Sequence, residues 1–557
     1  MDRNEILEKL AKDPEIDVLI VGGGINGAGA FLDMAINGVN VLLVDRADFC
    51  SGTSATSSHM AHGGIRYLEN GEFGLVREAV AERNRMIQNS PHMVKPLPTI
   101  IPIFKFWSGL LNAPFKFLNL LDKPAERGCL VIKIGLFFYD SFTGKNRTVP
   151  AHQFFNKKET LARYPHINKN VMFTAKYYDG LMLSPERLNS EIILDAEKAS
   201  KNAMALNYTS LEGVNENGVV LQDSNANQTL TVKPKIIINA TGPWIDDVNK
   251  NLGLTTRYIY GTKGSHIIVD NPILKEAVGN NEFFFENKDG RIVLLLPFFD
   301  KVIIGTSDLP IEDPDTANCS PDEVQYFLDL VKIVFPEIPI SQDQIVFTFS
   351  GVRPLEYQEA KTTGQITRDH SVKEDQTNGI KVLSLIGGKW TSYRAFGEQV
   401  TDSVLEKIGK QRITDTKAMK IGGGQHYPES PESEKQFIAN LAAKTLNSIP
   451  LVEMLFERYG TVIESILTEN NAVEMLDSNQ TITKSELVYL AKSEKIVHLD
   501  DLLLRRTSIG WLGQVDEKTL HEIAILVGSA LNWDTKKIET EIKWVKNQFL
   551  IKHNVTV

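Results

Sequence analysis

The sequence predicts an α/β protein with three parts: an N-terminal dinucleotide-binding domain, a substrate domain built on an antiparallel sheet, and an all-helical C-terminal domain. Three observations lead to this fold class. The chain opens with a strand, a glycine turn, a helix and a second strand within residues 16–45. Strand-like runs separated by short turns fill residues 258–305. Beyond about residue 430, apolar residues recur with the period of a helix.

The composition is that of an ordinary globular protein, with 42% hydrophobic and 23% charged residues among 557. A chain of this length predicts two or three domains. Its formal net charge of −10 argues against a nucleic-acid partner, which would favour a basic domain. Cys50, Cys129 and Cys319 are widely spaced and form no CxxC, so we expect a reducing compartment, no disulfide framework and no metal site.

The elements expected in the first two parts follow in order. A short charged helix precedes the apolar run IDVLIVGGG, after which INGAGAFLDMAING is predicted to be a helix and VNVLLVD a second buried strand. The segment KPKIIINATGPW at 233–244 predicts another buried strand that ends in a glycine turn. The runs HIIVD, RIVLLLP and KVIIGTSD predict an antiparallel sheet. IKVLSLIGGKWTSYR predicts a strand followed by a helix from about Tyr393.

The C-terminal part follows a segment of different character. The run GGGQHYPESPESE, which begins at Gly422, is rich in Gly, Pro and Ser, as is typical of a linker. EKQFIANLAAKTL, LVEMLFERYG and SELVYLAKSE have helical periodicity and carry no motif with an evident chemistry. We therefore predict a separate helical domain over residues 430–557, after a region with both other parts over residues 1–424.

Nothing in the sequence predicts a membrane-spanning helix, but one segment suits a membrane surface. The N-terminus is charged and lacks the apolar core of a signal peptide, and no run of about 18 apolar residues is present. Residues 100–121 are apolar and aromatic, interrupted by Lys105, Lys116 and two prolines. Such a segment suits an element that lies on a bilayer. A buried hydrophobic hairpin that covers the active site is the alternative, and the choice stays open.

A G-x-G-x-x-G motif follows the first strand and opens the first helix. Gly22 permits the tight turn, Gly24 lets the backbone approach a pyrophosphate, and Gly27 lets the helix pack closely on the strand. The helix N-terminus then faces the phosphates. Asp45 ends the second strand at the spacing of a residue that accepts hydrogen bonds from a ribose 2′-hydroxyl. The motif predicts dinucleotide binding through Gly22, Gly24, Ile25, Asn26, Gly27 and Asp45.

Both NAD and FAD bind to this fold, and three further segments favour FAD. The loop at 51–64 is dense in hydroxyl groups, NATGPW at 239–244 ends a strand, and IGGKWTSYR at 386–394 has two glycines before a helix. Because FAD is long and binds extended, contacts from both ends of the chain are expected. An ordinary strand–turn is the alternative for NATGPW. The contacts predicted from these segments are Gly52, Thr53, Ser54, Ser57, Gly63, Gly64, Ala240, Gly242, Trp244, Gly388, Lys389 and Thr391.

Seven motifs occur in one order along the chain: HGGIRYLE, NATGPW, KGSHIIV, IIGTSD, SGVRPL, ITRDH and GGKWTSYR. In this the sequence resembles the FAD-dependent glycerol-3-phosphate dehydrogenases over residues 16–400. The segment LDDLLLRRTSIGWLG at 499–513 is similar to that family's helical cap. The resemblance implies a glutathione-reductase-type FAD domain formed by segments about 16–90, 180–255 and 350–412, with substrate or cap segments about 91–179 and 256–349.

The resemblance also implies an activity, partners and a location. The activity is oxidation of sn-glycerol 3-phosphate to dihydroxyacetone phosphate, with electrons passed to a membrane quinone. The location is the cytoplasmic side of the inner membrane, as a peripheral protein. A homodimer is one expectation that the sequence leaves open.

Three other functions are weighed against this one. Relatives that reduce oxygen, the glycerophosphate oxidases, tend to carry a long insertion before GVRPL, whereas residues 305–353 are compact here. An amino-acid or amine oxidase of the same superfamily would have a carboxylate-binding arginine and no phosphate cluster. An inactive flavin sensor would lack the pocket cations or the histidines.

A phosphate dianion needs clustered cations, and arginine supplies a bidentate fork. Four cations each follow a glycine turn or a strand end, although any one of them alone would more often form a surface salt bridge. The resemblance implies that they line the substrate pocket with a tyrosine and a histidine, so that the loop from residue 51 serves both cofactor and substrate. The predicted substrate residues are Arg66, Tyr67, Arg353, Arg368, Lys389 and His62.

Loss of a hydride from C2 of the substrate requires a base for the proton of the C2 hydroxyl, and histidine titrates near working pH. His266 in KGSHIIV is the first choice, because it lies on a predicted strand of the substrate domain. His62, next to the Gly-Gly pair, is expected to pack against the flavin or to orient substrate. A structural histidine is the alternative for both. Lys389 or Arg353 near the ring would stabilise the negative charge of the reduced flavin.

Two positions depart from the family's pattern. Where many relatives have a lysine three residues before the histidine of HGG, this chain has His59, followed by Met60 and Ala61. The lost charge puts in doubt any contact that the lysine makes. Ser307 in GTSD replaces a common threonine, which is a smaller change.

Overall fold

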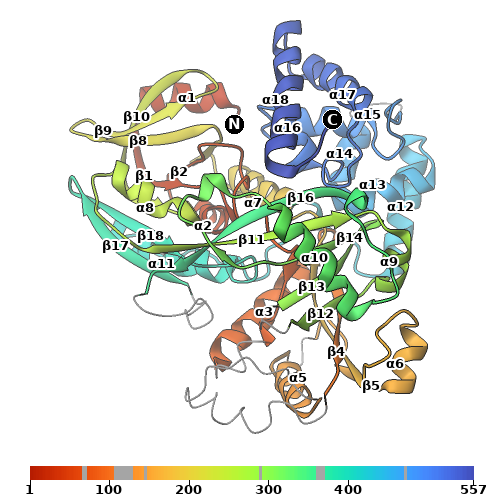
Figure 1. Cartoon of the computed structure of the whole chain (residues 1–557). Helices are drawn as coiled ribbons and strands as arrows, with labels where there is room; N and C mark the ends of the chain where they lie inside the picture. The colour runs from red at the N-terminus through yellow and green to blue at the C-terminus, as the bar shows by residue number, and fades with distance from the viewer. Residues whose placement is uncertain (66–71, 106–128, 144–146, 288–291, 359–369, 469–472) are drawn as a thin grey trace.

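The computed structural model describes all of the chain except six short segments, at residues 66–71, 106–128, 144–146, 288–291, 359–369 and 469–472. Two sheets form the body of the molecule, and the C-terminal helices pack at one end of it (Figure 1). This arrangement confirms the predicted α/β fold class with a helical C-terminal region. Among the described helices, none has the length and hydropathy to cross a membrane.

The first sheet contains the predicted dinucleotide-binding unit. Its inner strands are parallel, and the segments of them that pair side by side are mainly apolar, because both faces of the sheet are covered there. Val18 and Ile20 contact a core with helices α2 (Ile25–Ile36), α7 (Pro185–Ala199) and α11 (Tyr393–Ile408). Leu19 and Val21 contact a second core with α1 (Arg3–Lys12). The strand order is β17 (Ser371–Thr377), β18 (Ile380–Ile386), β10 (Gln228–Asn239), β1 (Glu15–Val21), β2 (Val41–Val44) and β7 (Ala203–Leu206), with β9 (Gly218–Asp223) and β8 (Thr209–Asn215) beside the start of β10.

The second sheet is mostly antiparallel, as the alternating runs predict. One pair departs from this: β12 and β4 are parallel neighbours, which joins a later part of the chain to an earlier one. The order is β15 (Leu309–Pro310), β11 (Ile259–Val269), β14 (Lys301–Gly305), β13 (Ile292–Phe298), β12 (Glu282–Glu286), β4 (Val94–Ile103), β6 (Phe173–Met182) and β3 (Met60–Ala61), with β16 (Ile345–Glu356) beside β11 and β5 (Gln153–Asn156) beside β6. Further helices between and around these strands are α3 (Phe73–Asn89), α5 (Cys129–Thr143), α6 (Lys157–Arg163), α8 (Ile245–Asn251), α9 (Pro272–Val278) and α10 (Pro321–Val334).

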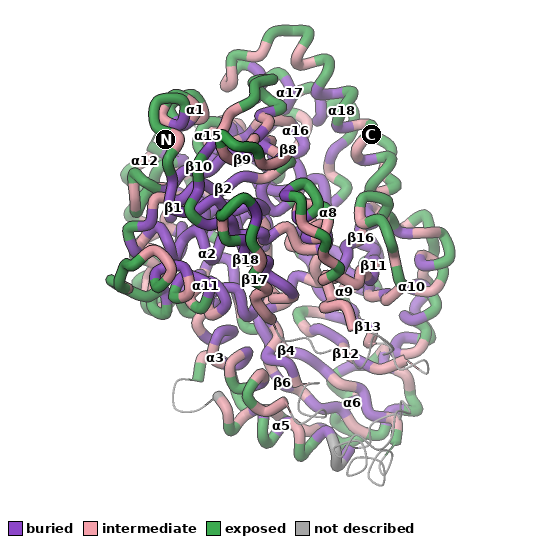
Figure 2. Tube along the Cα trace, turned by 90° about the vertical axis from the view of Figure 1, so that its left-hand side faces the viewer, coloured by how far each residue is buried: buried purple, intermediate pink, exposed green. Residues whose placement is uncertain are grey.

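The C-terminal helices share one hydrophobic core with the second sheet. Ile268 of β11 and Phe347 and Phe349 of β16 pack in the same cluster as Leu455 and Trp511 from the helical region. Figure 2 shows the result: strands in the middle of the second sheet, such as β13 (Ile292–Phe298), are buried, whereas many exposed residues lie on outer elements such as α5, α12 and α17. The helices are α12 (Pro431–Thr445), α13 (Ile449–Tyr459), α14 (Ile463–Thr468), α15 (Lys484–Ser493), α16 (Leu499–Asp501), a π-helical segment Leu502–Arg506, α17 (Glu517–Ala530) and α18 (Thr535–His553).

The glycines at the start of the predicted linker are buried. A Cβ on Gly422 would lie 2.1 Å from Glu191 Oε2, and one on Gly423 would lie 2.0 Å from the carbonyl oxygen of Tyr459. The N–H of Gly422 donates to Asp195 Oδ2 at 2.7 Å. These glycines therefore allow the chain to pass closely between α7 and the helical region, rather than to link the two loosely.

Candidate active site

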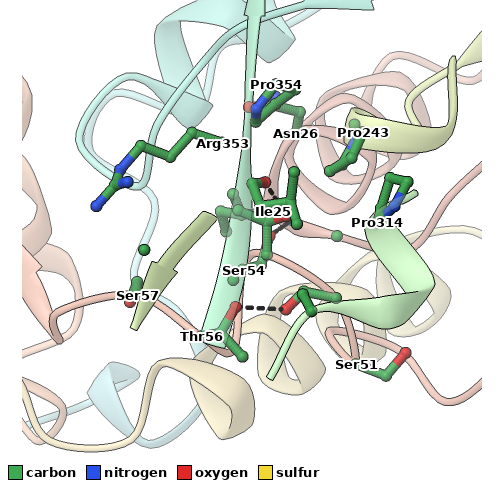
Figure 3. A pocket seen from close by; sticks show the side chains of 18 of the residues that line it. Ile25, Asn26, Ser51, Ser54, Thr56, Ser57, Pro243, Pro314, Arg353 and Pro354 are labelled. Atoms are coloured by element: carbon green, nitrogen blue, oxygen red, sulfur yellow. Dashed lines mark hydrogen bonds between the residues drawn. The ribbon is translucent and has the colours of Figure 1, made fainter. Parts of the chain in front are cut away.

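A cavity of about 1340 Å³ lies where the two sheets meet. The loops that follow β1, β2 and β10 line it from the first sheet, and strands β11 and β16 line it from the second. Figure 3 shows Ile25 and Asn26 of α2, the loop residues Ser51, Ser54, Thr56 and Ser57, and Arg353 arranged around it. Ligands of parallel α/β sheets bind at this edge, outside the carboxyl ends of the strands.

The glycine loop before α2 has the geometry that a dinucleotide needs. Gly22 has φ +106°, and a Cβ there would lie 2.7 Å from the carbonyl oxygen of Ala240. A Cβ on Gly27 would lie 1.9 Å from Gly22 O, so only glycine lets the helix approach the loop. Helical hydrogen bonding begins with Ala28, whose N–H donates to Gly24 O at 2.9 Å. Of the earlier N–H groups, that of Ile25 donates to Ser54 Oγ, and the others at the start of the helix can bind a phosphate.

Asp45 lies at the end of β2 and lines the cavity. Its carboxylate accepts hydrogen bonds from the N–H of Gly23 at 2.7 Å and the N–H of Ala47 at 3.0 Å. These bonds fix the carboxylate beside the glycine loop, where a ribose would follow the pyrophosphate. Burial raises the pKa of Asp45 to about 6.

The loop at 51–64 and the segment at 386–392 are held together, as expected if both contact one long ligand. Thr391 Oγ1 donates to the carbonyl oxygen of His62 at 3.1 Å, and Trp390 Nε1 donates to that of Ser54 at 2.9 Å. Gly387 and Gly388 both have positive φ, at 72° and 81°, so the backbone turns tightly before α11. Ser54 also ties the loop to α2, because its Oγ accepts from the N–H of Ile25 at 3.0 Å.

Most of the predicted cofactor residues line the cavity, and two do not. Gly27 lies behind Gly22, in the helix–strand contact predicted for it. The N–H of Gly63 donates to Asp179 Oδ1 at 2.8 Å and to Tyr139 Oη at 3.1 Å, which makes it a packing position behind the cavity wall. The residues on the lining are Gly22, Gly24, Ile25, Asn26, Asp45, Gly52, Thr53, Ser54, Ser57, Gly64, Ala240, Gly242, Trp244, Gly388, Lys389 and Thr391.

His266 lines the cavity from β11, where it pairs with Gly305 on one side and Phe349 on the other. Its ring stacks on Phe349 at 4.6 Å, and its Nε2 lies 2.8 Å from Ser58 Oγ. Burial, and then the nearby Arg353 guanidinium and His59, lower the pKa of His266 well below its ordinary value. The imidazole is therefore neutral at neutral pH. The sequence predicts a pKa near working pH for this residue, and burial places the pKa lower.

Arg353 also lines the cavity, from β16, which pairs with the β11 strand that carries His266. Its Nη2 donates to Thr306 Oγ1 at 2.9 Å, and its Nη1 donates to Ser307 O and Asp308 Oδ1, each at 3.2 Å. Thr306 directly follows Gly305, the residue paired with His266. The Arg353 cation and the neutral His266 are thus connected through neighbouring residues of one turn, since Arg353 bonds to Thr306 and His266 pairs with Gly305.

Lys389 and His62 line the cavity as well, from the two segments that Thr391 joins. Three other predicted substrate residues, Arg66, Tyr67 and Arg368, lie outside the described residues, as does most of the segment at 100–121. Their predicted roles stay predictions. Within the described ranges, no three His, Cys, Asp or Glu side chains gather as a metal site.

Several lining residues are not predicted from sequence. Ser58 contacts His266, Thr306 and Asp308 hold Arg353, and Asp179 orients the loop through Gly63. Three of these four residues carry a signal, because Ser58 belongs to the dense hydroxyl loop and Thr306 and Asp308 belong to the IIGTSD motif. Asp179 on β6 carries none. Only the pairing of β14 with β11 brings the IIGTSD segment beside His266.

The structure explains the two departures from the family's pattern. His59 is buried against the rings of Phe298, Phe349 and Trp511, and burial lowers its pKa to about 4. The imidazole is thus neutral and replaces an ammonium group with an aromatic contact. Ser307 Oγ donates to Glu323 at 2.6 Å and accepts from the N–H of Ser265 at 2.9 Å. A threonine hydroxyl can make the same two bonds.

Residues 17–402 match the family model of FAD-dependent oxidoreductases, and residues 414–538 match the model described as the C-terminal domain of alpha-glycerophosphate oxidase. A glycerol-3-phosphate dehydrogenase of Synechocystis is 32% identical over 517 residues, which cover 88% of each chain. The chain belongs to the FAD-dependent glycerol-3-phosphate dehydrogenase family. The predicted family and FAD cofactor are thereby confirmed.

Other members of this dehydrogenase family agree in sequence and in fold. An aerobic glycerol-3-phosphate dehydrogenase of Staphylococcus aureus is 29% identical and covers 91% of this chain and 89% of its own. The crystal structure of a glycerol-3-phosphate dehydrogenase from Bacillus halodurans complexed with FAD has a TM-score of 0.75 and 22% identity, over 99% of this chain and 97% of that one. This last likeness extends through the helical region as well as both sheets.

The residues of the cavity fit FAD. The glycine loop gives a pyrophosphate close access to the backbone, and the lining continues from there in both directions. Asn26 Nδ2 donates to Gly387 O at 3.0 Å, while its buried Oδ1 has no hydrogen-bond partner in the described part of the chain. A buried polar atom of this kind is normally satisfied by a ligand or water. In this family member, FAD would thus be held between α2 and the turn before α11.

Proposed function

We propose that this protein oxidises sn-glycerol 3-phosphate to dihydroxyacetone phosphate and passes the electrons to a quinone at a membrane surface. The observation that carries the proposal is the neutral His266 held beside the Arg353 cation at one end of the FAD cavity. A secondary alcohol with a phosphate nearby needs both groups: a proton acceptor and a fixed positive charge.

The residues divide the work as follows. FAD supplies the hydride acceptor when it is bound. His266 takes the proton at Nε2, because its Nδ1 is buried. Ser58 Oγ, 2.8 Å from Nε2, gives its own proton to that nitrogen and accepts the proton of the C2 hydroxyl. Arg353 and Lys389 bind the phosphate, with Arg66, Tyr67 and Arg368 proposed as further contacts from outside the described ranges. The positive charge of Arg353 lowers the pKa of His266. A bound phosphate dianion would offset this charge, raise the pKa again and make His266 a stronger base.

The proposal of a quinone as acceptor rests on the compact segment between β14 and β16. That segment contains only the short strand β15, the helix α10 and two single turns of 3₁₀ helix, so it lacks the long insertion expected of the oxidases. The matching relatives from Synechocystis and Staphylococcus aureus are named dehydrogenases.

The decisive experiment is anaerobic mixing of the purified yellow protein with glycerol 3-phosphate, followed by addition of a soluble quinone or of air. We expect rapid bleaching of the flavin absorbance, fast recovery with quinone and slow recovery in air. Equally fast recovery in air would make the protein an oxidase. Absence of bleaching with glycerol 3-phosphate, combined with bleaching by glycine or sarcosine, would replace the substrate by an amine.

We further propose that α5 contributes to the membrane contact, on the cytoplasmic face of the inner membrane. Phe137 is 66% exposed, and Ile134 and Phe138 of the same helix are exposed beside it. Lys133 is also exposed. Apolar side chains next to a lysine suit the headgroup region of a bilayer. Helix α5 lies at the opposite end of the molecule from α17 (Figure 1).

Replacement of Phe137 by serine is expected to reduce binding to vesicles of phosphatidylglycerol and phosphatidylethanolamine by about tenfold, because a phenyl ring leaves the bilayer. Co-sedimentation measures the bound fraction. Ile525→Ser is the matched control, since Ile525 is also exposed but lies on α17. Equal binding of Phe137→Ser and the wild-type protein would refute this contact.

A further inference from the structure

Helix α18 forms a wall of the FAD cavity, although it belongs to the helical region at the far end of the chain. Trp544, Gln548 and Lys552 line the cavity at intervals of four residues, so one face of the helix is turned toward it. Arg505 of the π-helical segment lines it too. The cofactor site is thus built from three parts of the chain rather than two.

The position of these residues identifies which half of FAD they face. The pyrophosphate belongs at the start of α2, and the ribose of the adenosine half belongs at Asp45. Arg46 and Asp48 follow Asp45 in the chain and line the cavity together with Leu211 of β8, the strand whose Thr209 N–H donates to Asp45 O at 2.6 Å. His62 and Lys389 line it from the two segments that Thr391 joins, and His266 lines it from β11. Arg505 and Asp48 are in direct contact, so the helical region covers the adenosine end.

A buried joint connects the helical region to the loop after β2. Arg505 Nε donates to Asp48 Oδ2 at 2.6 Å, and Arg506 donates to both oxygens of Asp48 at 2.8 and 2.9 Å. All three side chains are buried. Breaking this joint would take both guanidinium partners from the buried Asp48, although Arg505 would keep Asp500 and Asp501. This side of the cavity wall is therefore closed.

A second contact, on the surface, connects α18 to the same loop. Lys552 Nζ donates to the carbonyl oxygen of Asp315 at 2.8 Å. The Asp315 carboxylate accepts from Arg46 Nη2 at 2.6 Å and from Trp244 Nε1 at 3.1 Å. The Arg46 guanidinium lies 4.6 Å from the ring centroid of Trp244. The Arg46 and Asp315 side chains are 52% and 56% exposed, so this contact opens far more easily than the buried joint.

Arg46 and Asp48 are two residues apart, so the two contacts close a ring around the adenosine end of the cavity. We propose that the helical region is part of the FAD site, with Trp544, Gln548 and Lys552 against the adenosine half, and that the Lys552–Asp315–Arg46 contact is the side that opens when FAD leaves. The inference is independent of the substrate and of the electron acceptor, because it concerns only how the cofactor is retained.

The test is the rate at which FAD leaves the holoenzyme, followed by the rise in flavin fluorescence on dilution. Lys552→Met removes the ammonium group that donates to Asp315 O but keeps the aliphatic part of the side chain. Asp315→Asn removes the negative charge that forms the ion pair with Arg46. Each is expected to speed FAD release by about 3- to 10-fold, in line with the loss of one exposed polar contact. Asp329→Asn is the matched control, since Asp329 and Lys332 form an ion pair of 2.7 Å with exposures of 55% and 57% on α10.

Thermal unfolding of the apoproteins separates retention from general stability. We expect the three variants to unfold at the wild-type temperature without FAD, with faster release confined to Lys552→Met and Asp315→Asn. Release at the wild-type rate from both variants would overturn the proposal. So would equally fast release from Asp329→Asn, or faster release that is matched by a lower unfolding temperature of the apoprotein.

Discussion

Replacement of His266 by glutamine is expected to lower kcat for glycerol 3-phosphate by about 10²- to 10⁴-fold, the usual contribution of a general base. Glutamine can still form a hydrogen bond with Ser58 and pack on Phe349, but it cannot accept a proton at neutral pH. Steady-state kinetics with a quinone acceptor measures the loss, and the flavin absorbance of the purified variant shows that the cofactor stays bound. His62→Gln is the control, because His62 lines the same cavity and is the rival base. A larger loss in His62→Gln would reverse the assignment.

The pH dependence gives an independent check on the same residue. His266 acts as a base only when it is neutral, and its pKa is lowered well below the ordinary value by burial, then by Arg353 and His59. The substrate phosphate itself titrates at about pH 6. After correction for that ionisation, kcat/KM should remain level as pH falls through about 6.5 and should drop only in more acidic buffer. The profile of kcat should fall at a higher pH than that of kcat/KM, since the bound phosphate offsets Arg353. A decline centred near 6.5 that persists after correction for the substrate phosphate would contradict this environment for His266.

Replacement of Asp48 by alanine is expected to reduce the free energy of unfolding by about 3–5 kcal/mol, because it leaves two buried guanidinium groups without their shared carboxylate. Although burial alone would raise its pKa, the Arg506 and Arg505 guanidinium groups hold the pKa of Asp48 at about 2. The carboxylate is thus ionised at any pH at which the protein is handled. Urea unfolding of the holoenzyme at fixed FAD concentration measures the change.

A surface ion pair of similar length provides the comparison for Asp48. Arg412 Nε donates to Asp402 Oδ1 at 2.6 Å, and the Asp402 side chain is 59% exposed. Asp402→Ala should cost less than about 1 kcal/mol, as exposed pairs do. If Asp48→Ala and Asp402→Ala were equally stable, the buried joint would contribute little to the fold. Partial recovery in Asp48→Ala combined with Arg506→Leu would support the electrostatic explanation.

The parts of the fold that depend on local patterns are predictable from the sequence. The first strand, its glycine turn and the helix that follows are defined by residues close together in the chain, so the roles of Gly22 and Gly27 follow from spacing alone. The helix from Tyr393 begins at the predicted residue. The same holds for the cofactor loop, where the density of hydroxyl groups indicates Ser54 and its neighbours.

Contacts between distant segments are not predictable in this way. Arg506 and Asp48 are separated by 458 residues, and Ser58 and His266 by 208. Nothing in the periodicity of either segment indicates its partner, because such pairs form only once strands and helices have packed. The neutral state of His266 escapes sequence reasoning for the same reason, since its pKa depends on burial and on Arg353 from another strand.

The aromatic stacking around His266 limits which helical regions can be exchanged between members of this family. Phe349 lies against the His266 ring on one side and against Trp511 of the helical region, with ring centroids 4.6 and 4.9 Å away. His59 fits the same aromatic group, 5.4 Å from Trp511. A helical region taken from a relative with lysine in place of His59 would meet a surface shaped for a different partner. Chimeras should therefore be active only when residues 59, 349 and 511 are inherited together, so these three positions should change as a set during evolution.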